Sequence, residues 1–349
     1  MSNPERLERL RASLEEPLLV TDQVNVKYLT GFNSDNVALL VEPGRTRLFT
    51  DFRYAEGARG AVGEDVEVVE TERNVYAGVA QQLSGDVGFE AAVVSYANYE
   101  TLRSGSAELV PRTGVVEALR AVKDDAELAA IRKAAEVSDD AYERLSRERF
   151  IGRTEKELAW RMEQVLHECG GEKLSFDVAV GSGPNGAFPH ADPTDREVKA
   201  GELVVVDSGT TVEGYASDCT RTFATGSLAG ELKEAYAVCL EAQQAALDGV
   251  RAGVRGADVD AIARVRIDAS PFKGLFGHGL GHGVGMRIHE GPTLRPESKD
   301  VLQPGNVVTV EPGIYMPGKG GIRIEDLVVV TDGDAEVLTH FSKDLFSVE

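Results

Sequence analysis

The chain has 349 residues, of which 58 are acidic and 37 are basic, so its net charge is −21. This length is about twice that of a usual single domain, which predicts one large domain and a smaller one. The acidic charge and the lack of any Lys- or Arg-rich run argue against a nucleic-acid partner. No stretch approaches the ~20 apolar residues of a membrane span, and residues 1–17 contain no apolar signal core. We therefore expect a soluble, cytoplasmic protein without a membrane partner.

Residues 1–122 alternate short strand and helix patterns, which is typical of an α/β layer. A tight turn at Glu42-Pro43-Gly44-Arg45 separates two of the strand patterns. No cluster of chemically reactive residue types stands out in this half. The strand patterns fall at residues 18–20, 37–41, 46–50, 66–69 and 87–89, and a helical pattern falls at 74–83.

A long amphipathic helix begins behind the acidic N-cap Asp124, so we place the domain boundary after residue 122. A second helix starts at Thr154, where Glu157 completes a capping pair, and Trp160 on this helix is expected in the core. Later helices are expected at 229–250 and 257–269. The expected strands are 176–180, 203–206, 216–223, 307–311, 321–324 and 327–330. The expected domains are thus residues 1–122 and 123–349, and the overall class is α/β (α+β).

Four carboxylates stand within apolar strand patterns or at their ends, where a lone buried charge is costly. They are Asp207, Asp218, Glu311 and Glu325. A hairpin through the Gly214 turn would set Asp207 beside Asp218, and adjacent carboxylates repel unless a proton or a cation lies between them. Any one of the four could be an ordinary ion-pair partner, but the two pairs together indicate an oxygen-rich metal cage.

A nitrogen ligand is available in the glycine-rich run 277–285, which contains His278 and His282. Glycines let the backbone and the imidazole rings come close to a site. Four carboxylates and one imidazole suit a pair of divalent ions, with Mn²⁺ expected and Co²⁺ or Zn²⁺ as alternatives. The histidine disfavours an all-oxygen Ca²⁺ cage, and the lack of thiolate ligands disfavours a structural zinc site.

The run HGLGHGVGMRIHE at residues 278–290 resembles the signature of proline-specific peptidases of the pita-bread fold, namely aminopeptidase P and prolidase. The four carboxylates follow the order and spacing of that family's metal ligands. The resemblance covers residues 124–340, and the first half of the chain resembles the creatinase-like N-terminal domain more loosely. It implies a C-terminal pita-bread catalytic domain, a smaller creatinase-like α/β domain before it, and a homodimer.

The resemblance also implies a role for each ligand. Asp207 would bind one metal ion, and Asp218 and Glu325 would bridge both ions. His282 and Glu311 would complete the ligand set of the second ion. A bridging water of lowered pKa would be the nucleophile, with Glu311 as its general base. Creatinase shares the fold but lacks these ligands, so a creatinase-like reaction is disfavoured.

Further residues match the proline-specific branch of the family. His289 and His278 would hydrogen-bond the scissile carbonyl and help shape the proline pocket, and His190 falls at another active-site position. Arg323 and Tyr315 argue against methionine aminopeptidase, which shares the five ligands but usually lacks such a large N-terminal domain. Arg323 would fix a ligand carboxylate such as that of Asp218.

The length of the substrate stays open at this point. A dipeptidase must hold the free C-terminal carboxylate of its substrate, and Arg45 could do so from its own or a partner subunit. Asp35 could bind the free amine. We expect an Xaa-Pro dipeptidase, with an Xaa-Pro aminopeptidase acting on longer peptides as the alternative. A non-catalytic binding protein on the same fold is a third hypothesis, although such proteins typically lack metal ligands that this chain retains.

Overall fold

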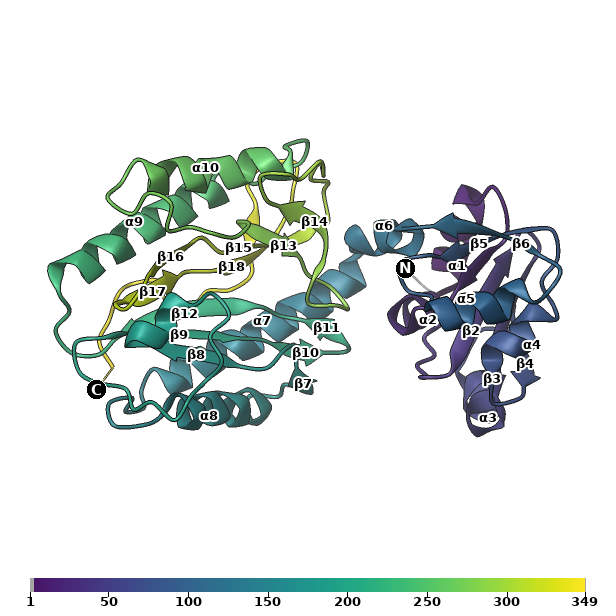
Figure 1. Ribbon diagram of the computed structural model, residues 1–349, viewed down its shortest axis with the longest axis horizontal. Coiled ribbons are helices and arrows are strands. Elements are labelled where there is room, and N and C mark those ends of the chain that lie inside the picture. The colour runs from purple at the N-terminus through teal and green to yellow at the C-terminus, as the bar shows by residue number, and fades with distance from the viewer. Residues whose placement is uncertain (1–2, 349) are drawn as a thin grey trace. The chain divides into compact units, whose positions relative to one another are not determined.

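The computed structural model describes residues 3–348, and the chain divides after Arg120 into two compact units (Figure 1). The boundary placed from the sequence, after residue 122, lies just beyond this division. Each unit buries its own apolar side chains, for example Leu40 and Phe49 in the first unit and Ile131 and Val308 in the second. No helix in the described part of the chain is long and apolar enough to cross a membrane.

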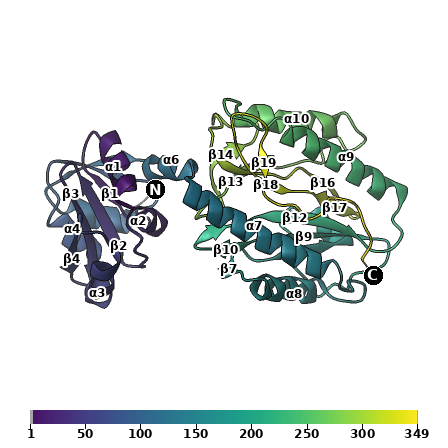
Figure 2. The same cartoon turned by 180° about the vertical axis from the view of Figure 1, so that it is seen from behind.

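The first unit is built on a six-stranded mixed sheet with the order β4-β3-β2-β1-β5-β6, and helices pack on it (Figure 2). β2 and β3 form the expected hairpin, in which Glu42 pairs with Arg45 across the turn. The strands are β1 (Leu18–Val20), β2 (Val37–Glu42), β3 (Arg45–Asp51), β4 (Val66–Thr71), β5 (Asp86–Glu90) and β6 (Glu108–Arg112). The helices are α1 (Asn3–Ser13), α2 (Gln23–Thr30), α3 (Phe52–Ala61), α4 (Val75–Ala80), α5 (Tyr96–Arg103) and α6 (Val115–Ala121), which ends at the division.

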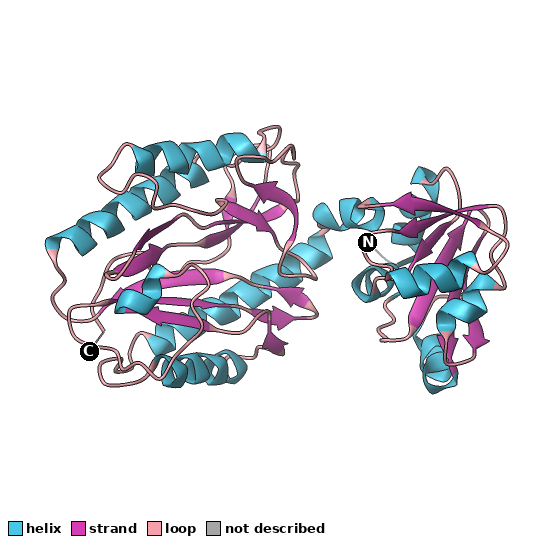
Figure 3. Ribbon diagram, viewed as in Figure 1, coloured by secondary structure: helices cyan, strands magenta, loops and turns pink. Residues whose placement is uncertain are grey.

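The second unit places its strands between two pairs of helices, α7 with α8 and α9 with α10 (Figure 3). These helices are α7 (Asp125–Leu145), α8 (Glu155–Glu168), α9 (Gly230–Leu247) and α10 (Gly256–Asp268). The strands before α9 are β7 (Lys173–Leu174), β8 (Ala179–Ser182), β9 (Leu203–Ser208), β10 (Thr210–Val212), β11 (Tyr215–Ala216) and β12 (Cys219–Ala224). The strands after α10 are β13 (Gly281–Gly283), β14 (Glu290–Leu294), β15 (Val307–Val310), β16 (Gly313–Met316), β17 (Gly320–Arg323), β18 (Asp326–Val329) and β19 (Glu336–Val337).

Local sequence explains where the first helix pair begins. Asp124 caps α7 and Thr154 caps α8, and each forms a capping box with a glutamate at the third helical position. One apolar cluster packs α7 and α8 against β8, β9 and β12. Another packs α9 and α10 against β15, β17 and β18. The two clusters fix the strands from opposite sides and leave polar side chains of the strand ends to meet between them.

Two expected strands and one expected core position differ in the structure. β8 begins at Ala179 rather than at residue 176. The strand expected at 216–223 is interrupted at Ser217 and Asp218, because Ser217 still hydrogen-bonds Thr210 before the chain moves on to pair with β9. The core position expected for Trp160 is wrong, since its side chain lies on the outer face of α8 and is 59% exposed.

Candidate metal centre

Three carboxylates come together where strands of different sheets meet. Asp207 lies in β9, Asp218 lies in the interruption before β12, and Glu325 lies between β17 and β18. Each offers one oxygen, and these three oxygens lie within 4.8 Å of one another. Strand pairing accounts for this meeting, because Asp207 is the register partner of Thr220, whose hydroxyl donates to Glu325 Oε2 at 2.7 Å.

His282 and Glu311 complete the group from β13 and from the residue after β15. His282 Nε2 lies 3.5 Å from Asp218 Oδ2 and 3.4 Å from Glu311 Oε1. The Thr309 hydroxyl accepts from the backbone N–H of His282 and donates to Glu311 Oε1, both at 3.0 Å. This close approach requires Gly281, since a Cβ there would lie 2.0 Å from the Thr309 carbonyl oxygen. We call Asp207, Asp218, His282, Glu311 and Glu325 the ligand cluster.

The ligand cluster concentrates negative charge that burial makes unfavourable. Burial, and then the neighbouring carboxylates, raise the pKa of Asp218 and of Glu325 well above the usual range. Burial raises the pKa of Glu311 to about 7, although Arg323 opposes this shift. Asp207 Oδ1 is buried without a hydrogen-bond partner among residues 3–348. A divalent cation bound by these oxygens would relieve the repulsion and satisfy that acceptor, so the residues fit a metal.

The orientation of the His282 ring also suits metal binding. Its Nδ1 lies 3.0 Å from the carbonyl oxygen of Gly283, so Nδ1 carries the proton and Nε2 presents a lone pair. Burial lowers the pKa of His282, which favours the neutral ring that a metal requires. A lone pair facing carboxylate oxygens is unfavourable unless a cation lies between them, which again indicates a metal site.

Arg323 lies buried behind the ligand cluster and holds one of its carboxylates. Its Nη2 donates to Asp207 Oδ2 at 2.6 Å, and its Nε donates to the Thr220 hydroxyl at 3.0 Å. The sequence predicts that Arg323 fixes a ligand carboxylate such as that of Asp218, and in the structure this carboxylate is that of Asp207. The reason is that β17, which carries Arg323, packs against β9.

Tyr315 connects Arg323 to His278. The Tyr315 hydroxyl accepts from Arg323 Nη1 at 3.0 Å and donates to His278 Nε2 at 2.9 Å. His278 Nδ1 donates to the Gly279 carbonyl oxygen at 2.7 Å. Burial lowers the pKa of His278 to about 4, which keeps this ring neutral. Both ring nitrogens are therefore engaged within the protein, and His278 acts here as part of the wall.

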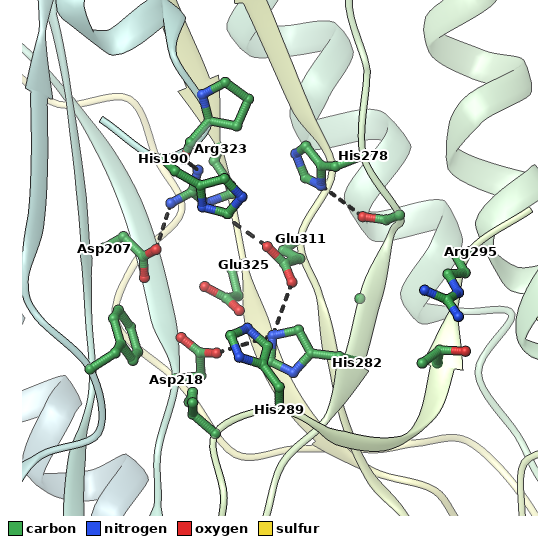
Figure 4. A pocket seen from close by; sticks show the side chains of 16 residues that line it. His190, Asp207, Asp218, His278, His282, His289, Arg295, Glu311, Arg323 and Glu325 are labelled. Atoms are coloured by element: carbon green, nitrogen blue, oxygen red, sulfur yellow. Dashed lines mark hydrogen bonds and ion pairs between the residues drawn. The ribbon is translucent and has the colours of Figure 1, made fainter. Parts of the chain in front are cut away.

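The ligand cluster lines a cavity of about 570 Å³ in the second unit (Figure 4). His190, His278, His289 and Arg323 line the same cavity. The His289 ring meets the His282 ring edge-on, with 4.3 Å between the ring centroids. The structure thus brings together the expected ligands, the three expected histidines and Arg323, with Tyr315 buried directly behind them.

Arg45 and Asp35 belong to the first unit and have partners there. Arg45 lies 3.3 Å from Glu42 and 3.8 Å from Glu67, and its side chain is 52% exposed. Asp35 accepts a hydrogen bond of 2.6 Å from the Tyr54 hydroxyl. Neither residue lines the cavity. Their expected substrate contacts stay predictions.

Several residues that line the cavity were missed by sequence reasoning. Phe176 and Ile288 give it apolar surface, and Arg295 adds a positive charge. Within the described chain, the Arg295 guanidinium has no ion-pair or hydrogen-bond partner. Arg295 follows directly on β14, whose Leu294 pairs with Gly281 of β13. Nothing in the local sequence marks this arginine, because its place in the cavity depends on that strand pairing.

Two family models match the chain. The Creatinase/Prolidase N-terminal domain matches residues 6–122, and Metallopeptidase family M24 matches residues 129–332. An uncharacterized peptidase of Bacillus subtilis is 36% identical over 334 residues, 94% of each chain. The solved structure of an Xaa-Pro dipeptidase from Bacillus anthracis is 36% identical and has a TM-score of 0.95, covering 99% of this chain and 100% of that one. An X-Pro aminopeptidase from Thermotoga maritima is 33% identical, with a TM-score of 0.88 and coverage of 98% and 100%.

These matches confirm the resemblance stated from the sequence and the architecture that it implied. The N-terminal model and the catalytic model follow each other in the expected order, and the solved relatives cover almost the whole chain. The matched catalytic region contains the whole ligand cluster and all residues that line the cavity. The chain therefore belongs to metallopeptidase family M24 and is a metallopeptidase that carries a creatinase/prolidase N-terminal domain.

Proposed function

We propose that this metallopeptidase cleaves the peptide bond between an N-terminal residue and proline, and that it acts as an Xaa-Pro dipeptidase. The observation that carries the proposal is the ligand cluster in the wall of a cavity that also contains His190, His289 and Arg295. Relatives named as an Xaa-Pro dipeptidase and an X-Pro aminopeptidase, both similar over nearly the full chain, support the proline specificity.

The ligand cluster would hold two divalent ions, with Mn²⁺ expected and Co²⁺ or Zn²⁺ as alternatives. Asp207, Asp218, His282, Glu311 and Glu325 would hold these ions. When bound, the ions supply Lewis acidity and lower the pKa of a water molecule. The hydrogen bonds of Arg323 to Asp207 and of Thr220 to Glu325 orient these two carboxylates in advance.

The remaining chemistry belongs to side chains of the cavity. A carboxylate oxygen of Glu311 takes the proton of the attacking water and later passes it toward the leaving proline nitrogen. His289 and His190 are the side chains with ring nitrogens available to orient the substrate carbonyl. His278, locked between Tyr315 and Gly279, shapes the wall that receives the proline ring.

The preference for a dipeptide is supported by charge. Arg295 is the cavity arginine without a partner in the described chain, so it can pair with the free carboxylate that follows proline in a dipeptide. Asp35 and Arg45 are proposed as further contacts for the amine and the carboxylate, from the same or a partner subunit. A homodimer and a cytoplasmic location are proposed from the same family resemblance.

The alternative is an Xaa-Pro aminopeptidase that accepts longer peptides. Comparing kcat/KM for Ala-Pro with that for Ala-Pro-Ala, each with added Mn²⁺, Co²⁺ or Zn²⁺, separates the two. A dipeptidase is expected to favour Ala-Pro by about 10-fold or more, because only the dipeptide places its carboxylate beside Arg295. Equal or faster cleavage of the tripeptide contradicts the dipeptidase proposal and supports the aminopeptidase.

A further inference from the structure

Glu155 is a fully buried carboxylate outside the ligand cluster, and its two oxygens bind the two ends of one segment. It is the first residue of α8. Oε1 accepts from the backbone N–H (2.8 Å) and the hydroxyl (2.7 Å) of Ser182. Oε2 accepts from Asn185 Nδ2 (2.8 Å) and from the backbone N–H (3.0 Å) and the hydroxyl (2.6 Å) of Thr194. Ser182 and Thr194 bracket residues 183–193, which we call the bracketed segment.

The bracketed segment forms part of the cavity wall. Its Pro189 and His190 line the cavity. The Pro189 carbonyl oxygen accepts from Arg323 Nη1 at 2.8 Å, so the segment also contacts the arginine that orients Asp207. The His190 side chain is exposed and makes no hydrogen bond within the described residues. Its position therefore depends on how the backbone of the segment is held.

Regular structure holds only the first part of this segment. Gly183–Ala187 forms a 3₁₀ turn, and residues 188–194 belong to no helix or strand. Asn185 Nδ2 adds a 3.2 Å bond to the Asp192 carbonyl oxygen, which closes the segment on itself. Irregular segments with few such anchors open locally at low cost. The bonds to Glu155 are therefore a main restraint on the part that carries His190.

The charge of Glu155 suits this task better than a neutral side chain would. No cation lies within ion-pair distance of Glu155 in the part of the chain that the structure describes. Five donors and the N-terminal end of α8 satisfy the carboxylate instead. A glutamine would keep the shape, but its NH₂ group would face donors of either Ser182 or Thr194. One end of the segment would then lose its bonds to the side chain at position 155, and would keep only its backbone restraints: the pairing of Ser182 with Val204, or the 3.2 Å bond from the Lys156 N–H to the Thr194 carbonyl oxygen.

We propose that Glu155 is a positioning residue: by fixing both ends of the bracketed segment it sets where His190 meets the substrate. The substrate contact of His190 rests on the proposed function. The anchoring of the segment does not, so the two can be tested separately.

The anchoring is tested by hydrogen–deuterium exchange of the metal-loaded full chain. Glu155→Gln is expected to speed exchange across residues 183–194 by about 10-fold or more, with wild-type rates in α9 and α10. Glu157→Gln is the matched control, because Glu157 caps the same helix but has no contact with the segment. Unchanged exchange in Glu155→Gln overturns the proposal, whatever the enzyme's activity.

The action through His190 is tested by a double-mutant cycle on Ala-Pro hydrolysis. Glu155→Gln and His190→Ala are each expected to lower kcat/KM by about 10-fold or more, and the double variant to match His190→Ala alone. Losses that multiply overturn the proposed route through His190. If Glu155→Gln fails to fold, Thr194→Val, which removes one donor to Oε2, takes its place in both experiments. A wild-type protein that cleaves no Xaa-Pro peptide refutes the proposed function, while the exchange result still decides the anchoring.

Discussion

Arg323 and Arg295 line the same cavity, and their surroundings give them different tasks. Arg323 is buried and donates to Asp207, Thr220 and Tyr315. All its groups are committed, so it orients other residues. Arg295 is exposed in the cavity without a partner among the described residues, so it is available to a ligand. Burial and hydrogen-bond partners therefore distinguish Arg323, which orients other residues of the site, from Arg295, whose guanidinium is accessible to a ligand.

Replacing Arg295 tests that assignment. Arg295→Ala is expected to raise KM for Ala-Pro by about 10- to 100-fold with a smaller change in kcat, since a hydrogen bond to a charged group contributes ~1.5–3 kcal/mol. Steady-state kinetics with Ala-Pro and with its C-terminal amide provide the measurement. For the amide, which lacks the carboxylate, the KM of Arg295→Ala should equal that of the wild type. Arg266→Ala, on the exposed side of α10, is the control. If KM rises in Arg45→Ala and not in Arg295→Ala, the free carboxylate is bound by the first unit and the assignment to Arg295 is wrong.

The residues of the ligand cluster could be predicted from the sequence because carboxylates are rare in buried strands. Asp207 and Glu311 each follow an apolar run, and an acidic residue at the end of such a run can be recognised from the sequence alone. Arg295 and Glu155 carry no such signal, because a loop arginine and a glutamate in the first turn of a helix are common. The sequence also did not indicate which carboxylate Arg323 contacts, because that depends on how β17 packs on β9.

The close contact between β13 and β15 positions His282 in the ligand cluster, and this contact requires glycine. A Cβ at Gly281 would lie 2.0 Å from the Thr309 carbonyl oxygen, whereas Gly277, in the same run, has open space around it. Apolar strand patterns predicted five of the six strands described in the first unit, but only about half of those in the second unit, where β13, β14 and β16 were not expected. They failed at Asp218, where the chain changes strand partners within two residues, because that change is set by the hydrogen bonds of Ser217.

Replacing each of these two glycines with alanine tests whether the contact between β13 and β15 positions His282. Gly281→Ala is expected to push β13 away from β15, to displace His282, and to lower metal affinity at least about 10-fold. Gly277→Ala should bind metal as the wild type does. Isothermal titration with Mn²⁺ measures both. Wild-type affinity in Gly281→Ala would show that the strand contact is not what positions the histidine.

At the scale of the whole molecule, metal binding and folding stability are linked. Burial and neighbouring carboxylates raise the pKa of Asp218, so its ionised form destabilises the metal-free fold. An acid whose folded pKa is raised costs stability increasingly as the pH rises above its unfolded pKa, and costs little once the pH falls below it. Bound cations reverse this effect, because they stabilise the folded state by mass action.

Asp218→Asn separates the two contributions. The metal-free variant is expected to melt a few degrees above the metal-free wild type at pH 8, where ~1 kcal/mol corresponds to about 2–4 °C for a domain of this size. The difference should shrink as the pH falls toward 5, because the cost of a raised folded pKa decreases as the pH approaches the unfolded pKa. Added Mn²⁺ should raise the Tm of the wild type much more than that of the variant. Calorimetry that found the metal-free variant less stable at pH 8 would contradict the repulsion argument.

The reaction proposed for this chain depends on bound metal and requires proline in the substrate. The most direct measurement is hydrolysis of Ala-Pro and Ala-Ala by the chelator-treated full chain as Mn²⁺ is titrated back. We expect no cleavage without metal, activity that reaches a plateau at about two ions per chain, and Ala-Pro preferred by about 100-fold in kcat/KM. Cleavage by the chelated protein, or equal rates for the two dipeptides, would contradict this proposal.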